Sequence, residues 1–202
     1  MSVFSQLMMR KKTKENYIYL QTVGSPTISN GVANNFSNSN YLTMPMDFVF
    51  GDDFELQFKF ATGELTSNIQ ALFNFITEIR AGVHSNRLSL QITNTSSCNV
   101  IFRTGENVAV EGTIANTFSA NTTYYVKYVY KNSYVTISLS TDGNTWTTLA
   151  SGSISGIPTY STERTIGYGY HNGQHRPFFG SIDFNSSYII KNGTKYIFTI
   201  GA

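Results

Sequence analysis

The groups best suited to contact a ligand gather near the end of the chain, in Tyr168, Tyr170, His171, Asn172, His175 and Arg176. Aromatic rings pack against the C–H surfaces of sugars, while planar amide and guanidinium groups bond to sugar hydroxyls. The pattern predicts an exposed ligand-binding loop for a carbohydrate. The alternative is that Tyr168 and Tyr170 pack across neighbouring strands and that the rest of the loop is only solvated.

Paired carboxylates would be needed for glycoside cleavage, because an acid and a nucleophile or base must stand roughly 5 to 10 Å apart. Asp53 and Glu55 are the nearest approach to such a pair. No third acidic residue continues their spacing, and Glu55 lies between phenylalanines that point to the opposite face. We therefore expect no catalytic residue and no enzymatic activity.

Other reactive groups are few. Cys98 is the only cysteine and stands in a strand-like run, where a small buried side chain is expected rather than a nucleophile. His171 and His175 would have metal-ligand spacing only on a helix, and Asn172-Gly173 between them predicts a loop. We expect no bound metal or other cofactor. Calcium is left open and unassigned, and the acids available for it are Asp52, Asp53, Asp142 and Asp183.

Strands are the elements expected to position these residues. Only 13% of the 202 residues are charged, whereas 14% are aromatic, which suits pleated, half-buried surfaces better than amphipathic helices. Fourteen short runs alternate or are apolar: 17–22, 47–50, 54–62, 70–80, 87–93, 99–103, 107–111, 123–130, 134–140, 145–150, 165–170, 178–184, 187–191 and 195–200. So many strands favour two packed sheets over a small barrel.

Local patterns fix several details of this sandwich. In the run 54–60, Phe54, Leu56, Phe58 and Phe60 share one face, which predicts an inward row. Segment 70–79 also satisfies a helical period, and its context favours a strand. Turns are expected at 130–134, at 141–144 and at Asn192-Gly193, and the Asn- and Ser-rich stretch 34–40 is expected to be a loop.

Three blocks carry a resemblance to a known family, in matching order over roughly residues 40 to 200. The run 53–60 resembles the family's early core strand, and 124–130 followed by 135–146 resembles its central hairpin pair. The closing block holds Thr165-Ile166-Gly167-Tyr168, Phe178-Phe179-Gly180-Ser181-Ile182-Asp183-Phe184 and Ser187-Tyr188-Ile189-Ile190. The chain thus resembles concanavalin A-like lectin/glucanase domains of the laminin G-like type.

The resemblance implies an all-β fold, a two-sheet antiparallel β-sandwich or jelly roll, and a binding module. It also implies that Trp146, which falls in the central hairpin, packs in the core rather than stacking on a ligand. The chain length suits one sandwich domain, 16–202, with an N-terminal attachment arm, 1–15, before it. The alternative for 1–15 is a frayed terminus or a tail that precedes the first strand.

Charge and hydropathy limit the partners. The net charge of +2 depends on Arg10, Lys11, Lys12 and Lys14, since the remaining basic residues are fewer than the 12 acidic ones. No basic stripe for nucleic acid is visible over the rest of the chain. No apolar run of 18 residues predicts membrane insertion, and the N-terminus does not read as an export signal.

Jelly-roll modules with this closing pattern resemble those of bacteriophage virion proteins. The resemblance implies a non-enzymatic structural protein of the virion, as a capsid decoration, head fibre or tail component, assembled in the host cytoplasm. Residues 1–14 would attach to other virion proteins, the sandwich would adhere to a cell-surface glycan, and homo-oligomers are expected. The alternatives are a glycan hydrolase or lyase on the same fold and a purely architectural subunit.

Overall fold

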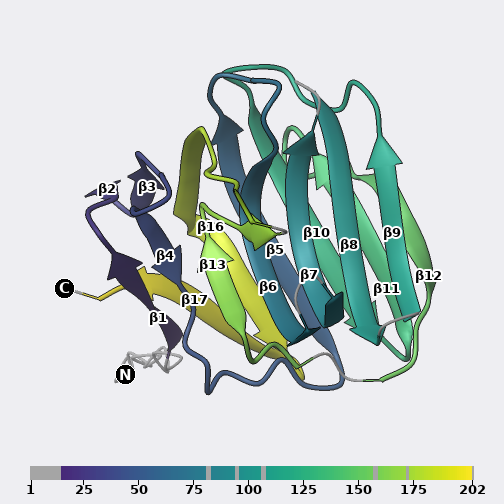
Figure 1. The fold of residues 1–202 in the computed structure, drawn as a ribbon. Helices are drawn as coiled ribbons and strands as arrows, with labels where there is room; N and C mark the ends of the chain where they lie inside the picture. Colours follow the sequence, from purple (N-terminus) through teal and green to yellow (C-terminus); the bar gives the residue numbers. More distant parts are fainter. Residues whose placement is uncertain are drawn as a thin grey trace, which may run out of the picture.

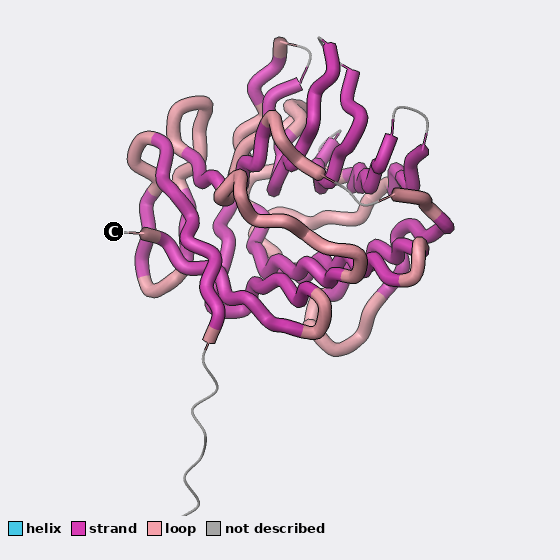
Figure 2. Tube along the Cα trace, turned by 90° about the horizontal axis from the view of Figure 1, so that it is seen from below, coloured by secondary structure: helices cyan, strands magenta, loops and turns pink. Residues whose placement is uncertain are grey.

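The computed structural model describes residues 15–80, 83–93, 96–105, 108–156, 159–171 and 173–201. Only strands and loops occur along these residues (Figure 2). The strands are β1 (Asn16–Val23), β2 (Thr27–Ser29), β3 (Val32–Asn34), β4 (Tyr41–Thr43), β5 (Phe54–Thr62), β6 (Gln70–Arg80), β7 (Val83–Thr93), β8 (Ser97–Gly105), β9 (Val108–Ile114), β10 (Thr123–Lys131), β11 (Tyr134–Ser140), β12 (Thr147–Ser153), β13 (Glu163–Ile166), β14 (Tyr170–His171), β15 (Gln174–His175), β16 (Gly180–Lys191) and β17 (Thr194–Ile200).

The strands pack as two layers of an antiparallel β-sandwich of the jelly-roll type (Figure 1). One layer, called here the β5 layer, has the order β12-β11-β10-β5-β16-β17-β1, and the other, called the β6 layer, has the order β4-β13-β6-β7-β8-β9. Their strands pair antiparallel, except that β1 runs parallel to β17. The predicted fold class is confirmed.

Strand β1 belongs to both layers. Its first part, from Asn16 to Leu20, pairs with β17, and its last part, from Gln21 to Val23, pairs with β4. A single strand therefore joins the two layers along one side of the sandwich.

The core lies between the layers and consists largely of aromatic and aliphatic rows. Phe54, Leu56, Phe58 and Phe60 of β5 are at most 3% exposed, as the alternation predicts. The ring of Phe58 lies 5.1 Å from that of Phe73 in β6. Burial of each such side chain contributes roughly 1.5 to 3 kcal/mol, and a slip of one residue would expose the whole row. The pairing register of β5 is therefore firmly set.

Most of the predicted strands are confirmed, including segment 70–79, which lies in β6. Three predictions were wrong. Residues 47–50 form no strand, and Phe50 reaches the core from a loop. The predicted strand 165–170 is interrupted, since β13 ends at Ile166 and β14 begins at Tyr170. The two strands predicted at 178–184 and 187–191 are one strand, β16, which begins at Gly180. The short strands β2, β3, β4 and β15 were not predicted.

The predicted turns take the backbone shapes that their residues favour. Asn192 and Gly193 between β16 and β17 have φ angles of 47° and 77°, and Asn132 and Ser133 between β10 and β11 have 51° and 57°. Gly143 has a φ of 78° in the loop after β11. No helix long and apolar enough to cross a membrane occurs in the part of the chain that the structure describes. The proposed arm, 1–15, lies outside the described residues except for Glu15.

Candidate binding surface

The predicted ligand-binding residues lie in and around a small hairpin. Tyr170 of β14 pairs with His175 of β15, and His171 pairs with Gln174, with Gly173 at a φ of 75° in the turn. Asn172 lies outside the described residues. The loop expected here is thus the turn of a hairpin, which contains Gly173.

The hairpin folds back over the outer face of β6. Arg176 and Gly169 exchange two main-chain hydrogen bonds, of 2.9 and 3.2 Å, at the base of the hairpin, and the carbonyl of Arg176 also accepts from the N–H of Ala71. A Cβ atom on Gly169 would stand 2.9 Å from that of Ala71 and 3.2 Å from that of Asn74. Only glycine allows the main chain to come so close to β6.

Tyr168 and Arg176 are buried, so the prediction that they are exposed was wrong. They are 6% and 7% exposed because the hairpin presses them onto the β6 layer. The Tyr168 ring stacks on Tyr41 of β4 with centroids 4.6 Å apart, as the packing alternative supposed, and its hydroxyl shares a 2.6 Å hydrogen bond with Nδ1 of His175. Burial, with the carboxyl of Glu163 nearby, raises the pKa of Tyr168 to about 12.

The hairpin also borders a hollow of about 410 Å³. Its wall includes the polar residues Asn38, Asn68, Gln174, His175 and Arg176 and the exposed aromatic ring of Phe179. Tyr170, 44% exposed, stands nearby with its ring 5.2 Å from that of His175. Convergent amides, a guanidinium group and exposed aromatic rings are the groups that sugars need.

Beneath the hairpin, the outer face of β6, β7 and β8 holds polar residues that sequence reasoning missed: Asn74, Arg87, Ser89, Gln91 and Arg103. Asn74 pairs with Ser89 across β6 and β7, and Arg87 pairs with Arg103 across β7 and β8. Nη1 of Arg176 donates to Oε1 of Gln91 at 3.0 Å, which connects the hairpin to this face.

The sequence did contain a signal for this face. Arg87, Ser89 and Gln91 alternate with Leu88, Leu90 and Ile92 in β7, which places the polar set opposite the core. The burial of these polar residues could not be predicted from the local sequence. The hairpin that helps to cover them follows about 80 positions later in the chain. Burial, with Arg176 and Arg103 nearby, lowers the pKa of Arg87 to about 10.

Asp53 and Glu55, considered as a carboxylate pair, both support the fold. Oε1 of Glu55 accepts from the hydroxyl of Tyr188 at 2.7 Å and lies 3.6 Å from Nζ of Lys127. Oδ1 of Asp53 accepts from the N–H of Asn132 in the turn after β10. These contacts give each carboxyl a structural partner.

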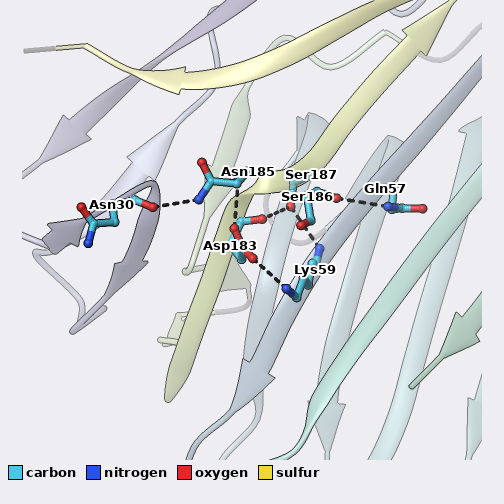
Figure 3. Close-up of polar contacts among 7 residues, drawn as sticks. All are labelled: Asn30, Gln57, Lys59, Asp183, Asn185, Ser186 and Ser187. Atoms are coloured by element: carbon cyan, nitrogen blue, oxygen red, sulfur yellow. Dashed lines mark hydrogen bonds and ion pairs between the residues drawn. The ribbon is translucent and has the colours of Figure 1, made fainter. Parts of the chain in front are cut away.

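Asp183 takes part in a polar network on the outer face of the β5 layer (Figure 3). Its Oδ2 accepts from Nζ of Lys59 at 2.9 Å, and its Oδ1 accepts from the N–H of Asn185. Asp142 accepts main-chain N–H groups from Asn144 and Thr145, both at 2.8 Å. Among the described residues, no three His, Cys, Asp or Glu side chains gather as a metal site. Calcium binding stays an open prediction.

Cys98 and Trp146 differ in their outcomes. Cys98 is fully buried as predicted, and burial raises the pKa of its thiol, which disfavours the reactive thiolate. The prediction that Trp146 packs in the core was wrong. Its ring is half-buried beside the β5 layer, where Nζ of Lys127 lies 4.1 Å from the ring centroid. Trp146 precedes β12, and its ring lies on the outer side of the β5 layer beside Lys127. It therefore does not pack in the core.

Comparison with known proteins shows a shared fold. No family model matches the chain, and no curated protein matches its sequence. Among solved structures, the enzymatically active domain of tailspike protein 2 of bacteriophage CBA120 is similar over 91% of this chain and 30% of that one, with 12% identity and a TM-score of 0.61. This chain therefore spans less than a third of that tailspike domain.

Two further structures have the same architecture. Domains LG4-5 of the mouse laminin α1 chain match over 91% of this chain and 46% of theirs, with 13% identity and a TM-score of 0.55. Domain 4 of AbnA, an arabinanase from Geobacillus stearothermophilus solved with arabinotriose, matches over 81% of this chain and 78% of that one, with 12% identity and a TM-score of 0.54. At such identities the likeness concerns the fold.

Proposed function

We propose that this chain is a carbohydrate-binding domain of a bacteriophage structural protein and has no enzymatic activity of its own. The observation that carries the proposal is the hollow beside the β14–β15 hairpin, which combines amide, imidazole and guanidinium groups with the ring of Phe179. Sugar sites need both polar groups that fix hydroxyls and rings that cover C–H surfaces. The proposed ligand is a glycan of the bacterial cell surface.

The shared fold supports both parts of the proposal. The AbnA domain is in complex with arabinotriose, and the tailspike is a phage protein. By analogy, the sandwich would display its hairpin side to the glycan while residues 1–14 attach to other virion proteins, in a homo-oligomer assembled in the host cytoplasm. Fold analogy alone does not fix a function, so binding must be measured.

The test is retention of the protein on immobilised surface polysaccharide from host bacteria, with the released sugars analysed. Retention without release supports the proposal. Release of shortened or unsaturated sugars would contradict it in favour of a hydrolase or lyase, and neither retention nor release would favour an architectural subunit.

Two variants locate the site. Removing an aromatic ring by Phe179→Ala or Tyr170→Ala is expected to weaken retention about fivefold, because a stacking contact contributes on the order of 1 kcal/mol. Tyr19→Ala is the matched control, since Tyr19 is 62% exposed on β1. Circular dichroism should show all three variants folded. Equal loss in the Tyr19 variant, or no loss in the other two, would place the glycan elsewhere.

A further inference from the structure

Three arginines on the binding surface have buried donors that no described residue accepts. Nε and Nη2 of Arg87, Nε of Arg103 and Nε of Arg176 are buried without a hydrogen-bond partner. Arg87 and Arg176 are each 7% exposed as whole residues. A buried donor without an acceptor is costly, so proteins rarely keep several of them together without a use.

Register and contacts place these arginines on one face. Arg87 and Arg103 lie opposite each other on β7 and β8, both on the side away from the core. Arg176 reaches the same face from the hairpin, because its Nη1 bonds to Gln91, which lies two side chains along this face of β7 from Arg87. The arginines therefore share one outer face, which the β14–β15 hairpin reaches through the bond from Arg176 to Gln91.

The carboxyls near this cluster leave most of the donors unused. Glu111 of β9 stands 3.6 Å from Nη2 of Arg103, and its side chain is 55% exposed. Glu163 of β13 accepts from Nδ2 of Asn74 and from the hydroxyl of Thr165 at 2.7 Å. Three guanidinium groups thus face two carboxyls among the described residues, and neither carboxyl bonds to Arg87 or Arg176.

Neutral polar atoms surround the arginines and are also unpaired. Oδ1 of Asn74, Oγ of Ser89 and Nε2 of Gln91 are buried and have no hydrogen-bond partner within the described part of the chain. An amide oxygen, a hydroxyl and an amide nitrogen can bond to the hydroxyls of a sugar ring. Donors for an anion and partners for hydroxyls therefore occur side by side.

We propose that the outer face of β6, β7 and β8 beneath the β14–β15 hairpin binds the carboxylate of an acidic sugar residue, a uronic acid. The proposal rests on the proposed glycan-binding function and names the class of glycan. A planar guanidinium group matches a carboxylate with two parallel N–H···O bonds, and the carboxylate supplies the acceptors that Arg87 and Arg176 lack. The unpaired amide and hydroxyl atoms then fix the ring.

A sugar titration monitored by NMR tests this site directly. The Nε–H resonances of the full chain are monitored while glucuronate or galacturonate is added, with glucose and galactose as the neutral counterparts. We expect saturable shifts of the Arg87, Arg103 and Arg176 signals with the acids only. Equal shifts with the neutral sugars, or none with either acid, would overturn the proposal. Equal shifts with inorganic sulfate would indicate an adventitious ion only and would overturn it as well.

A pair of variants separates a binding role from a structural one. Arg87→Met removes unpaired donors, so the free protein should keep or raise its unfolding temperature while uronate affinity falls at least tenfold. Arg164→Met is the matched control, because Arg164 is equally buried and bonds to the carbonyls of Tyr160, Pro45 and Phe48, each at 2.6 Å. It should unfold at a lower temperature. A similar loss of stability in the Arg87 variant would make that arginine structural and overturn the proposal.

The two proposals fail in different ways. Retention on a neutral surface polysaccharide, with no uronate shift, would leave the glycan-binding function standing and remove the acidic-sugar site. Failure of retention on every polysaccharide, together with no shift by any sugar, would remove both.

Discussion

Buried arginines on this sandwich fall into two kinds that exposure does not distinguish. Arg164 and Arg87 are both 7% exposed. Arg164 donates to three main-chain carbonyls, whereas two nitrogens of Arg87 have no partner among the described residues. The difference lies in hydrogen bonding, and it separates a side chain whose donors are satisfied within the fold from one whose donors are not.

Asp142 offers a test of a turn at the level of one residue. Main-chain N–H groups of Thr145 and Asn144 and the hydroxyl of Ser140 hold its pKa at about 2, below its usual value. The folded state favours the carboxylate, so this stabilisation is present above pH 4 and lost as the pH falls through about 2. Asp142→Ala should therefore lower the unfolding temperature at pH 7. The difference in unfolding temperature between the variant and the unchanged protein should become smaller toward pH 2. A difference that does not depend on pH would contradict this account.

The sequence predicted a loop at the candidate site but not the burial of two of its residues. Tyr170 and His175 lie in a hairpin, where Asn172-Gly173 predicted a loop. Arg176 is buried because it bonds to Gln91, 85 positions earlier, and Tyr168 because it stacks on Tyr41. Contacts between such distant residues leave no local pattern, so no reading of the loop alone could find them.

At the scale of elements, long alternating strands were predictable and short ones were not. The row of Phe54, Phe58 and Phe60 specifies β5 because one face must be buried. Strands β2, β3 and β4 have three residues each, too few to establish a period. They form because neighbouring strands offer them partners.

Strand β16 was predicted as two strands because it contains a bulge of several residues. Asp183 pairs with Lys59 and Tyr188 with Gln57, so residues 184–187 stand opposite Phe58 alone. Figure 3 shows how side chains close the gap: Oγ of Ser187 accepts from the N–H of Lys59 at 3.0 Å and donates to the carbonyl of Asp183 at 2.7 Å. The alternation of inward and outward side chains breaks at this bulge. A local sequence pattern does not distinguish such a break from a turn between two strands.

Ser187→Ala tests this closure. Ser187 is 2% exposed, so its loss leaves a buried N–H and a carbonyl without their partner and should cost about 1 to 3 kcal/mol of unfolding free energy. Ser186→Ala is the control, because Ser186 contributes its main-chain carbonyl to Gln57 and not its side chain. Urea denaturation measures both. Equal costs would show that the Ser187 hydroxyl does not hold the bulge.

For the whole molecule, two deletions separate the contribution of β1 to folding from the attachment role expected of the segment before it. Deletion of residues 1–14 should leave thermal unfolding nearly unchanged and abolish association with the particle, if the arm attaches there. Deletion of residues 1–23 should prevent folding, because β1 is the strand that pairs with both β17 and β4. Scanning calorimetry and co-sedimentation with particles are the measurements. Unchanged incorporation after the shorter deletion would contradict the attachment arm.

The parallel pairing of β1 with β17 has a mechanical consequence. Asn16 faces Tyr196 and Leu20 faces Ile200, so the entry of the first strand and the exit of the last lie at opposite ends of one ladder (Figure 1). Tension between residues 16 and 200 pulls these neighbours in opposite directions along their length, and it loads all the hydrogen bonds between them at once rather than peeling them singly. A tether through both ends would therefore meet high resistance to shear.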